Sequence, residues 1–272
     1  MLNGERDLEN HSEAGRKPVL MIVVGRQRVG KTSFLNALTQ HLQERGGNFA
    51  IWDADQLNET NNMSVFHTDA IRPRCSDPED VKAWLEARFI ELGERCYDAV
   101  LDVGGGDTPL ARLIKDVPVA ATLEEFGVRL VAVHVVGPDM ADLDYLDRFD
   151  RDDLFAPEAV LIVRNGGLVL TGRSVDFAFE QMDRHPSVAR ATVKGAELVT
   201  MPLLSCMTEV TDRKLRFADA MNGKPGVDGR TLSLFDRARV RKWWNVDFPA
   251  MAARIPPSWL PETRSEATGT GG

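Results

Sequence analysis

Several residue patterns are missing from this chain, and each absence excludes a class of protein. The 3 cysteines, Cys75, Cys96 and Cys206, lie far apart and form no C-x-x-C pair. This spacing indicates free thiols in a reducing cytoplasm and excludes a disulfide framework or a zinc site of the usual spacing. The 5 histidines are scattered as well. No run approaches the roughly 20 apolar residues that a membrane-spanning helix needs, so we expect no transmembrane segment and a cytoplasmic protein.

An excess of positive charge is also missing. The formal net charge is −8, which argues against a protein that coats DNA with its whole surface. The local exception is the basic and aromatic segment 237–244, which reads R-A-R-V-R-K-W-W. Its side chains could contact DNA through phosphates and stacked bases. Alternatively they form an amphipathic helix whose Trp243, Trp244 and Phe248 dock on the sheet or on a protein partner, and we favour this second interpretation.

What the chain does contain is a phosphate-binding pattern in its proper context. Residues 25–32 read G-R-Q-R-V-G-K-T and directly follow the apolar run 19–24, which fits G-x-x-x-x-G-K-[ST] between a buried strand and a helix. Backbone N–H groups of such a loop and the positive end of the helix dipole bind phosphate. Lys31 is expected to reach the β- and γ-phosphates, and the Thr32 hydroxyl to bind Mg²⁺. The loop residues expected to contact the nucleotide are Gly25, Arg28, Val29, Gly30, Lys31, Thr32 and Ser33.

Apolar runs alternate with helical patterns along the rest of the chain. Strands are predicted at residues 19–24, 49–52, 99–103, 129–136, 159–163 and 197–201. Helices are predicted at residues 31–44, 78–95, 109–114, 139–149, 175–184, 208–221 and 233–253. This order predicts an α/β P-loop NTPase fold, with a mostly parallel sheet and helices on both faces. We expect one domain at 18–262 with C-terminal helices from about residue 206, a flexible segment at 1–17 and a disordered tail at 263–272.

Acidic residues follow two of the predicted strands, at the edge where parallel sheets bind ligands. After the second strand, residues 53–58 read D-A-D-Q-L-N. One carboxylate of Asp53 and Asp55 could assist at Mg²⁺ and the other could orient a water or accept a hydroxyl proton. The alternative is that both cap the following turn. Asp102 ends the third apolar strand, as a Walker B acid does, and the glycine run 104–106 permits close approach to a phosphate.

Two later strand ends carry candidate contacts for the nucleotide base. Asn165 follows the fifth strand, where it could hydrogen-bond an adenine edge or serve as a turn residue before Gly166. Pro202 follows the sixth strand and could form part of an apolar wall for the base. The guanine-reading pattern N-K-x-D does not occur in the chain, which disfavours GTP.

Together these motifs resemble the ParA/MinD/CobQ group of P-loop ATPases, which includes plasmid partition, StbB-type stability and TraL-type conjugal-transfer proteins. The resemblance covers about residues 18–205 and rests on G-x-x-x-x-G-K-T, D-x-D-Q and Y-D-x-x-x-D. It implies that Lys31 and Thr32 bind nucleotide and Mg²⁺, that Asp55 positions the lytic water, that Asp53 assists at the metal or switch, and that Asp102 is the Walker B acid. It further implies ATP and Mg²⁺ as cofactors.

The resemblance also implies an assembly. ATP would be sandwiched between two protomers, and the homodimer would bind DNA, a membrane or a partner protein such as a DNA-binding adaptor or transfer component. The family's loop reads K-G-G-x-G-K-T, but here those first three positions are Arg26, Gln27 and Arg28. Arginine keeps the charge of the family's trans-acting lysine with a different geometry. Arg26 or Arg28 could act across the dimer, or the sandwich dimer could be altered or absent. A further alternative is that these residues form a solvated basic edge of the loop.

The leading hypothesis is therefore a Mg-ATP-hydrolysing switch in plasmid partition, plasmid stability or conjugal transfer. One alternative is a small-molecule kinase similar to shikimate kinases, in which Asp53 or Asp55 would contact the acceptor hydroxyl. The other is a module that binds nucleotide and a partner with little turnover.

Overall fold

The computed structural model describes residues 16–55, 62–104, 108–144, 146–147, 155, 157 and 159–264. Parts of several predicted features lie outside these residues. They are the N-terminal segment as far as residue 15, residues 56–58 of the acidic turn, Gly105, Gly106 and Asp107 of the glycine-rich loop, and the tail from residue 265.

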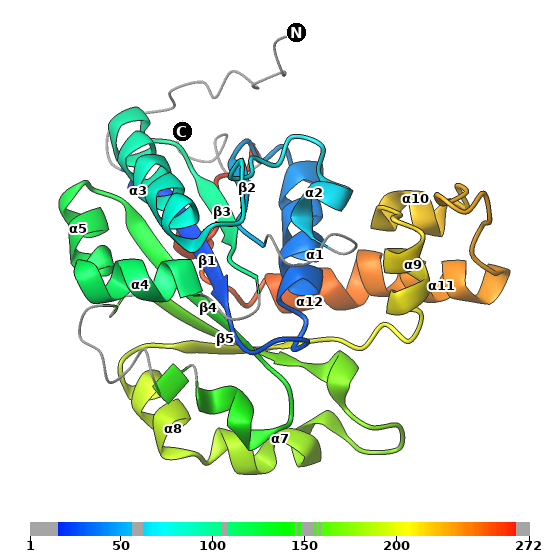
Figure 1. Ribbon diagram of the computed structural model, residues 1–272. Coiled ribbons are helices and arrows are strands. Elements are labelled where there is room, and N and C mark those ends of the chain that lie inside the picture. Colours follow the sequence, from blue (N-terminus) through cyan, green and yellow to red (C-terminus); the bar gives the residue numbers. More distant parts are fainter. Residues whose placement is uncertain are drawn as a thin grey trace, which may run out of the picture.

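The described residues form one six-stranded parallel sheet (Figure 1). Its strands are β1 (Val19–Val24), β2 (Ala50–Asp53), β3 (Ala99–Asp102), β4 (Arg129–Val136), β5 (Ala159–Asn165) and β6 (Glu197–Met201). Their order is β2-β3-β1-β4-β5-β6. Since every neighbouring pair is parallel, all six carboxyl ends lie at one edge of the sheet. The order places β1 between β3 and β4, so the loop after β1 lies beside the ends of both.

Helices cover both faces of the sheet, and alternate residues of β1 point into different cores (Figure 1). Met21 and Val23 belong to the core that α1 (Lys31–Glu44) covers. Leu20 and Ile22 belong to the opposite core, under α3 (Pro78–Arg95), α4 (Thr108–Asp116) and α5 (Val119–Glu125). A third apolar cluster lies under α7 (Val175–Asp183) and α8 (Pro186–Val193). The predicted α/β fold with helices on both faces is confirmed.

Many predicted elements have the expected bounds. The strands 19–24, 129–136 and 197–201 and the helices 31–44 and 78–95 match at both ends, and the remaining strands differ by one or two residues. Short elements were not predicted: α2 (Met63–Phe66), α5, α8 and the 3₁₀ turns η3 (Gly166–Leu168) and η5 (Pro257–Trp259). Most of these are too short to show a helical hydrophobic period, which explains why the sequence does not reveal them.

Three predicted helices differ from the structure. Residues 139–149 begin with the 3₁₀ turn η1 (Met140–Leu143). Residues 208–221 are divided into α9 (Met207–Asp212) and α10 (Phe217–Met221), because Lys214 takes a left-handed conformation with φ of 53° that no helix continues. Residues 233–253 form α11 (Leu234–Lys242), the π-helical turn η4 (Trp243–Asp247) and α12 (Phe248–Ala252). Pro249 lacks the N–H that a regular α-helix would use there.

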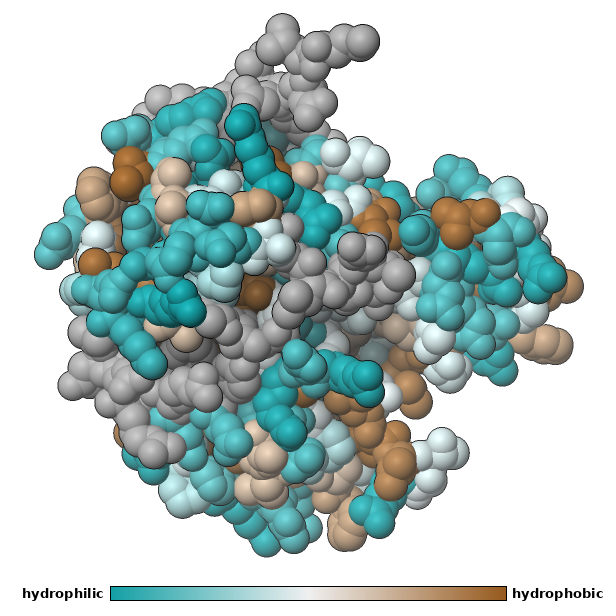
Figure 2. Space-filling view, viewed as in Figure 1, coloured by the Kyte–Doolittle hydropathy of each residue, from teal (hydrophilic) through white to brown (hydrophobic). Residues whose placement is uncertain are grey.

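The C-terminal helices pack on the α1 side of the sheet, while α9, α10 and one end of α11 project to one side (Figure 1). Trp243 and Trp244 are buried, with Nε1 of Trp243 donating to the Pro202 carbonyl (2.8 Å) and Nε1 of Trp244 to the Glu44 carboxylate (3.0 Å). Figure 2 shows a mainly hydrophilic surface on the projecting helices with a few separate hydrophobic residues. Within the described chain, no helix combines the length and the apolar character that crossing a membrane requires.

Candidate functional site

The loop after β1 has a backbone that requires glycine at two positions. Gly25 has φ of 143°, and a Cβ there would lie 2.5 Å from the Val135 carbonyl oxygen. Gly30 has φ of 95° at the N-cap of α1, and a Cβ there would lie 2.4 Å from Nδ2 of Asn165. Arg28 also has positive φ, 65°, although it is not glycine. These conformations curl the loop over the N-terminus of α1, where phosphate-binding loops present their N–H groups.

Lys31 lies inside this curl. Its Nζ donates to the carbonyl oxygens of Gly25 (2.8 Å) and Arg26 (3.0 Å), and the side chain is buried. An ammonium group has three donors, so these two bonds leave one N–H for a further acceptor. The loop therefore holds a positive charge at the helix N-terminus, and both features favour an anionic ligand.

Thr32 and Asp102 meet at the junction of β1 and β3. The parallel register places Asp102 beside Val23, and the Thr32 hydroxyl donates to Asp102 Oδ2 at 2.6 Å. Asp102 is fully buried, and burial raises its pKa to about 6, although the hydrogen bonds from Thr32 and from the Gly104 N–H act in the opposite direction. A hydroxyl and a carboxylate this close are the hard oxygen ligands that Mg²⁺ prefers.

The described residues contain no group of three His, Cys, Asp or Glu side chains that could hold a metal ion alone. Mg²⁺ in nucleotide sites takes one or two protein ligands and completes its shell with phosphate and water. Thr32 and Asp102 are the residues that fit this role.

Asp53 and Asp55 have different surroundings, although they are close in sequence. Asp53 is completely buried and accepts hydrogen bonds from the N–H groups of Asp55 and Ser64, both at 3.1 Å. Burial raises its pKa, and these two N–H groups and Arg72 oppose that shift. The Asp55 carboxyl instead lies against Gly104 in the loop after β3, where a Cβ would be 2.7 Å from its Oδ1. Asp55 is therefore the acid of the pair that faces the glycine-rich loop.

Arg72 belongs to this site and was not predicted. Its Nε lies 3.4 Å from Asp53 Oδ2, and its Nη2 donates to the Asp55 carbonyl at 2.7 Å. Ile71 forms a parallel bridge with Trp52, so this segment extends the sheet beside β2. The only local signal in the sequence is that Arg72 precedes Pro73, which favours an extended backbone. Its partners cannot be inferred from that signal.

Arg26 does not point into the loop. Its Nη1 lies 3.2 Å from Oδ1 of Asp142 in the η1 turn after β4 and 3.5 Å from Oδ2 of Asp139, the N-cap of that turn. Asp142 is largely buried and also accepts the Gly137 N–H at 2.8 Å; burial raises its pKa and the nearby Arg26 opposes the shift. Arg28 is exposed, so the two arginines of the loop have different surroundings.

Asn165 and Pro202 lie at the expected strand ends, and both have partners in the protein. Asn165 Nδ2 donates to the Val29 carbonyl of the phosphate loop (2.8 Å), and its Oδ1 accepts the Gly167 N–H (2.9 Å). The Pro202 carbonyl accepts from Trp243. In this structure Asn165 thus ties the phosphate loop to the turn after β5.

The structure brings together most of the predicted site. The loop, Lys31, Thr32, Asp102 and Asn165 are joined by the contacts above, and Asp53 and Asp55 are linked to Asp102 through β2-β3 pairing and Gly104. The side chains of Arg26 and Arg28 are exceptions, since one is paired beside η1 and the other is exposed. Pro202 is another, because the contact described above joins its carbonyl to Trp243 and not to the phosphate loop.

Comparison with known proteins adds similarity of fold only. No family model matches the chain, and no curated protein matches it. A nucleotide-binding protein from Archaeoglobus fulgidus, solved with ADP, is 17% identical with a TM-score of 0.43, over 71% of this chain and 86% of that one. The 54 kDa signal recognition particle protein from Aeropyrum pernix, solved with GDP, is 15% identical with a TM-score of 0.41, over 92% of this chain and 51% of that one.

The MinD cell division protein from Aquifex aeolicus is 13% identical with a TM-score of 0.39, over 84% of this chain and 97% of that one. These values are too low to carry an activity from those proteins to this one. The phosphate loop between β1 and α1, the parallel sheet and the acid that ends β3 nevertheless give this chain the α/β fold of a P-loop nucleotide-binding protein.

Proposed function

We propose that the protein binds and hydrolyses Mg-ATP and acts as a nucleotide-controlled switch. The observation that carries the proposal is the placement of Lys31 inside the curled loop, next to the Thr32–Asp102 contact of 2.6 Å. Together they offer an anion site and a hard-ligand site at one helix N-terminus. We propose ATP and not GTP because the chain lacks N-K-x-D.

In this proposal each residue has one task. Lys31 donates its remaining N–H to the terminal phosphates, and the loop N–H groups bind the other phosphate oxygens. Thr32 and Asp102 hold Mg²⁺, which neutralises charge on the phosphates when bound. Asp55, beside Gly104, orients the attacking water and accepts its proton.

Nucleotide binding is tested by titrating the protein with Mg-ATP and Mg-GTP in a calorimeter. The Lys31→Ala variant should bind Mg-ATP about 10- to 100-fold more weakly, because a charge-assisted hydrogen bond contributes about 1.5–3 kcal/mol. The control is Lys224→Ala, an exposed lysine in the segment after α10 that pairs with Asp219 on that helix. Equal affinity in the two variants, or no binding by the wild type, would contradict the proposal.

The switch would work in plasmid partition, plasmid stability or conjugal transfer, with ATP favouring a homodimer that binds a protein partner. Support for this step comes from the motif resemblance alone. Its test is sedimentation of the Asp55→Ala variant with Mg-ATP and with Mg-ADP. We expect a dimer with ATP and a monomer with ADP, because loss of the water-orienting acid should keep ATP intact. The same mass in both nucleotides would contradict the switch.

A further inference from the structure

We propose that Arg72 is a positioning residue which, together with Asp53, fixes the backbone that presents Asp55. In this assignment Asp53 is an anchor inside the protein and does not contact the metal. The inference rests on the proposed function, since it concerns the rate of the hydrolysis that Asp55 would support.

The first argument is that the same ion pair holds both backbone polar groups of Asp55. Asp53 Oδ1 accepts the Asp55 N–H at 3.1 Å, and Arg72 Nη2 donates to the Asp55 carbonyl at 2.7 Å. Arg72 and Asp53 are themselves joined, with Nε and Oδ2 3.4 Å apart. With its N–H and its carbonyl both held, the peptide planes on either side of Asp55 have little freedom, and the direction of its side chain toward Gly104 is set.

The second argument concerns what holds the ion pair. The Ile71 N–H donates to the Ile51 carbonyl (2.8 Å), and the Asp53 N–H donates to the Ile71 carbonyl (3.0 Å). These two bonds fix the backbone beside Arg72 as an extension of the sheet at β2. Asp53 Oδ2 additionally accepts the Ser64 N–H at 3.1 Å. The same carboxylate therefore accepts one N–H from Asp55 and one from Ser64, which lie before and after residues 56–61 in the chain.

The third argument is energetic. Asp53 has no exposed surface, and Arg72 is the cation that lies against it. Breaking such a pair leaves a buried charge with fewer partners. The backbone then moves to expose the charge, or the carboxylate takes up a proton. Either response would release Asp55. Because misplacement of a reacting group by about 1 Å can cost about 100-fold in rate, turnover should respond more than affinity does.

The test compares Arg72→Met, Asp53→Asn and the double variant, with Arg74→Met as the matched control at an exposed arginine two residues away. Turnover and KM for Mg-ATP are measured for each, and melting temperature is recorded. We expect Arg72→Met to lose about 10- to 100-fold in kcat with KM changed less than about 2-fold. The double variant should be no slower than the slower single variant, because the two residues act through one contact.

Arg72→Lys gives the second readout. Lysine keeps the charge opposite Asp53 but cannot hold Asp53 and the Asp55 carbonyl together as a planar guanidinium does, so kcat should recover only in part. This variant also keeps the test valid if Arg72→Met folds poorly. An Arg72→Met protein with wild-type kcat, or single losses that multiply in the double variant, would overturn the inference.

Hydrogen exchange separates this inference from the proposed function. If the wild type hydrolyses no nucleotide, the proposed hydrolysis fails, while the anchoring can still be measured without ligand. The amides of Asp55 and Ser64 should then exchange about 10-fold faster in Arg72→Met than in Arg74→Met, since local opening becomes easier. Unchanged exchange at both amides would overturn the anchoring itself.

Discussion

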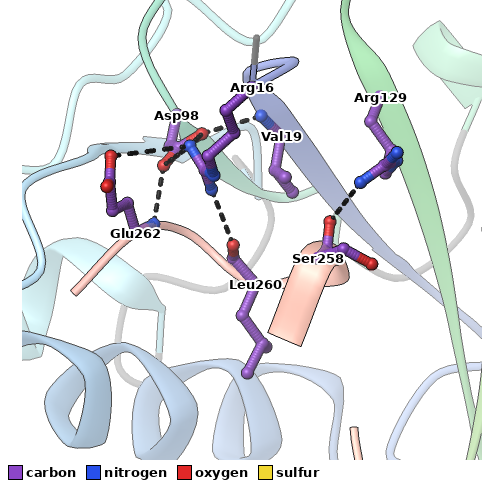
Figure 3. A network of polar contacts seen from close by, with 7 residues as sticks. All are labelled: Arg16, Val19, Asp98, Arg129, Ser258, Leu260 and Glu262. Carbon is purple, nitrogen blue, oxygen red and sulfur yellow. Dashed lines mark hydrogen bonds and ion pairs between the residues drawn. The ribbon is translucent and has the colours of Figure 1, made fainter. Parts of the chain in front are cut away.

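At the scale of single residues, Asp98 is the clearest case of a charge that organises the chain (Figure 3). It lies just before β3 and accepts the N–H groups of Val19 and Glu262, each at 2.7 Å, while Arg16 Nη1 lies 3.0 Å from both carboxylate oxygens. Arg16 also donates to the Leu260 carbonyl. One carboxylate thus joins the start of β1, the start of β3 and the C-terminal segment. This Asp belongs to the Y-D-x-x-x-D motif, and its contacts are structural.

Replacing Asp98 with alanine should lower the free energy of unfolding by about 2–4 kcal/mol, because two backbone N–H groups lose their acceptor and Arg16 loses its partner. Urea denaturation followed by circular dichroism measures this. The control is Glu262→Ala, which removes only the side chain 4.0 Å from Arg16 and keeps the backbone N–H. That exposed pair should contribute less than about 1 kcal/mol, and equal losses in both variants would contradict the role assigned to Asp98.

At the scale of elements, sequence patterns predict the secondary structure of each segment but not its contacts with other segments. The continuous apolar runs predicted the strands because a parallel sheet buries both faces of each strand, and the glycine pattern predicted the loop before α1. Asp102 could be placed because it ends such a run. Arg72 could not be, since its contacts with Asp53 and Asp55 require the extra bridge beside β2. The pairing of Arg26 with η1 depends likewise on β4 lying next to β1.

Contacts between α1 and the C-terminal helices give a prediction about pH. His41 on α1 packs edge-on against Trp244 and Phe248, with ring centroids 6.0 and 5.6 Å away. Its Nδ1 lies 2.9 Å from Nη1 of Arg45, which can only donate, so the ring is neutral with the hydrogen on Nε2. Burial, and then the charge of Arg45, lowers the pKa of His41 to about 4 from the usual 6.5.

The unfolded chain therefore binds a proton at His41 between pH 6.5 and pH 4 that the folded protein does not bind. Stability from this group is complete above pH 6.5, falls as the pH drops toward 4, and is constant below that. The loss of folding stability due to His41 between pH 6.5 and pH 4 is roughly 3 kcal/mol, since each unit of pKa difference corresponds to about 1.4 kcal/mol. Burial also lowers the pKa of His134 to about 4, so His134 likewise reduces folding stability as the pH falls.

The measurement is the free energy of unfolding of the wild type and of His41→Leu at several pH values between 7 and 4. Leucine does not titrate, so the variant should lose about 3 kcal/mol less than the wild type over this range. The contribution of His134 is common to both proteins and cancels in the comparison. Parallel curves for the two proteins would contradict the assignment to His41.

At the scale of the whole molecule, the C-terminal helices complete a core that the sheet and α1 begin. Trp243 packs against Phe217 and Phe248 with centroids 5.0 and 4.9 Å apart, and Trp244 stacks on Phe217 at 4.8 Å. Both indoles are buried and hydrogen-bonded, so neither offers a ring face for stacking on DNA bases. For these two tryptophans, the structure therefore agrees with the interpretation that segment 237–244 docks against the protein's own core. On α11, Arg239 pairs with Asp236 at 2.6 Å and Arg241 donates to the Met221 carbonyl at 3.1 Å. Contact of these arginines with DNA phosphates would compete with those partners and would be salt-dependent.

This arrangement predicts that residues 18–262 unfold as one unit. Trp243 is 1% exposed and joins the C-terminal helices to the loop after β6 through the Pro202 carbonyl. Trp243→Ala should lower stability by about 3–5 kcal/mol, as other large-to-alanine changes in cores do. The whole protein should show this loss, because the same cluster lines the face of the sheet under α1.

Urea unfolding followed by circular dichroism and by the fluorescence of the remaining tryptophans tests this prediction. Both signals should move to the same lower midpoint in Trp243→Ala, since coincident transitions indicate one cooperative unit. The control is Phe235→Ala on α11, the helix that leads into η4. This aromatic side chain is 78% exposed, and its loss should change stability by less than about 0.5 kcal/mol. A separate early transition of the C-terminal helices, with the rest of the protein at its original midpoint, would show that the chain has two units. In that case the proposed nucleotide site would fold without the helices that follow β6.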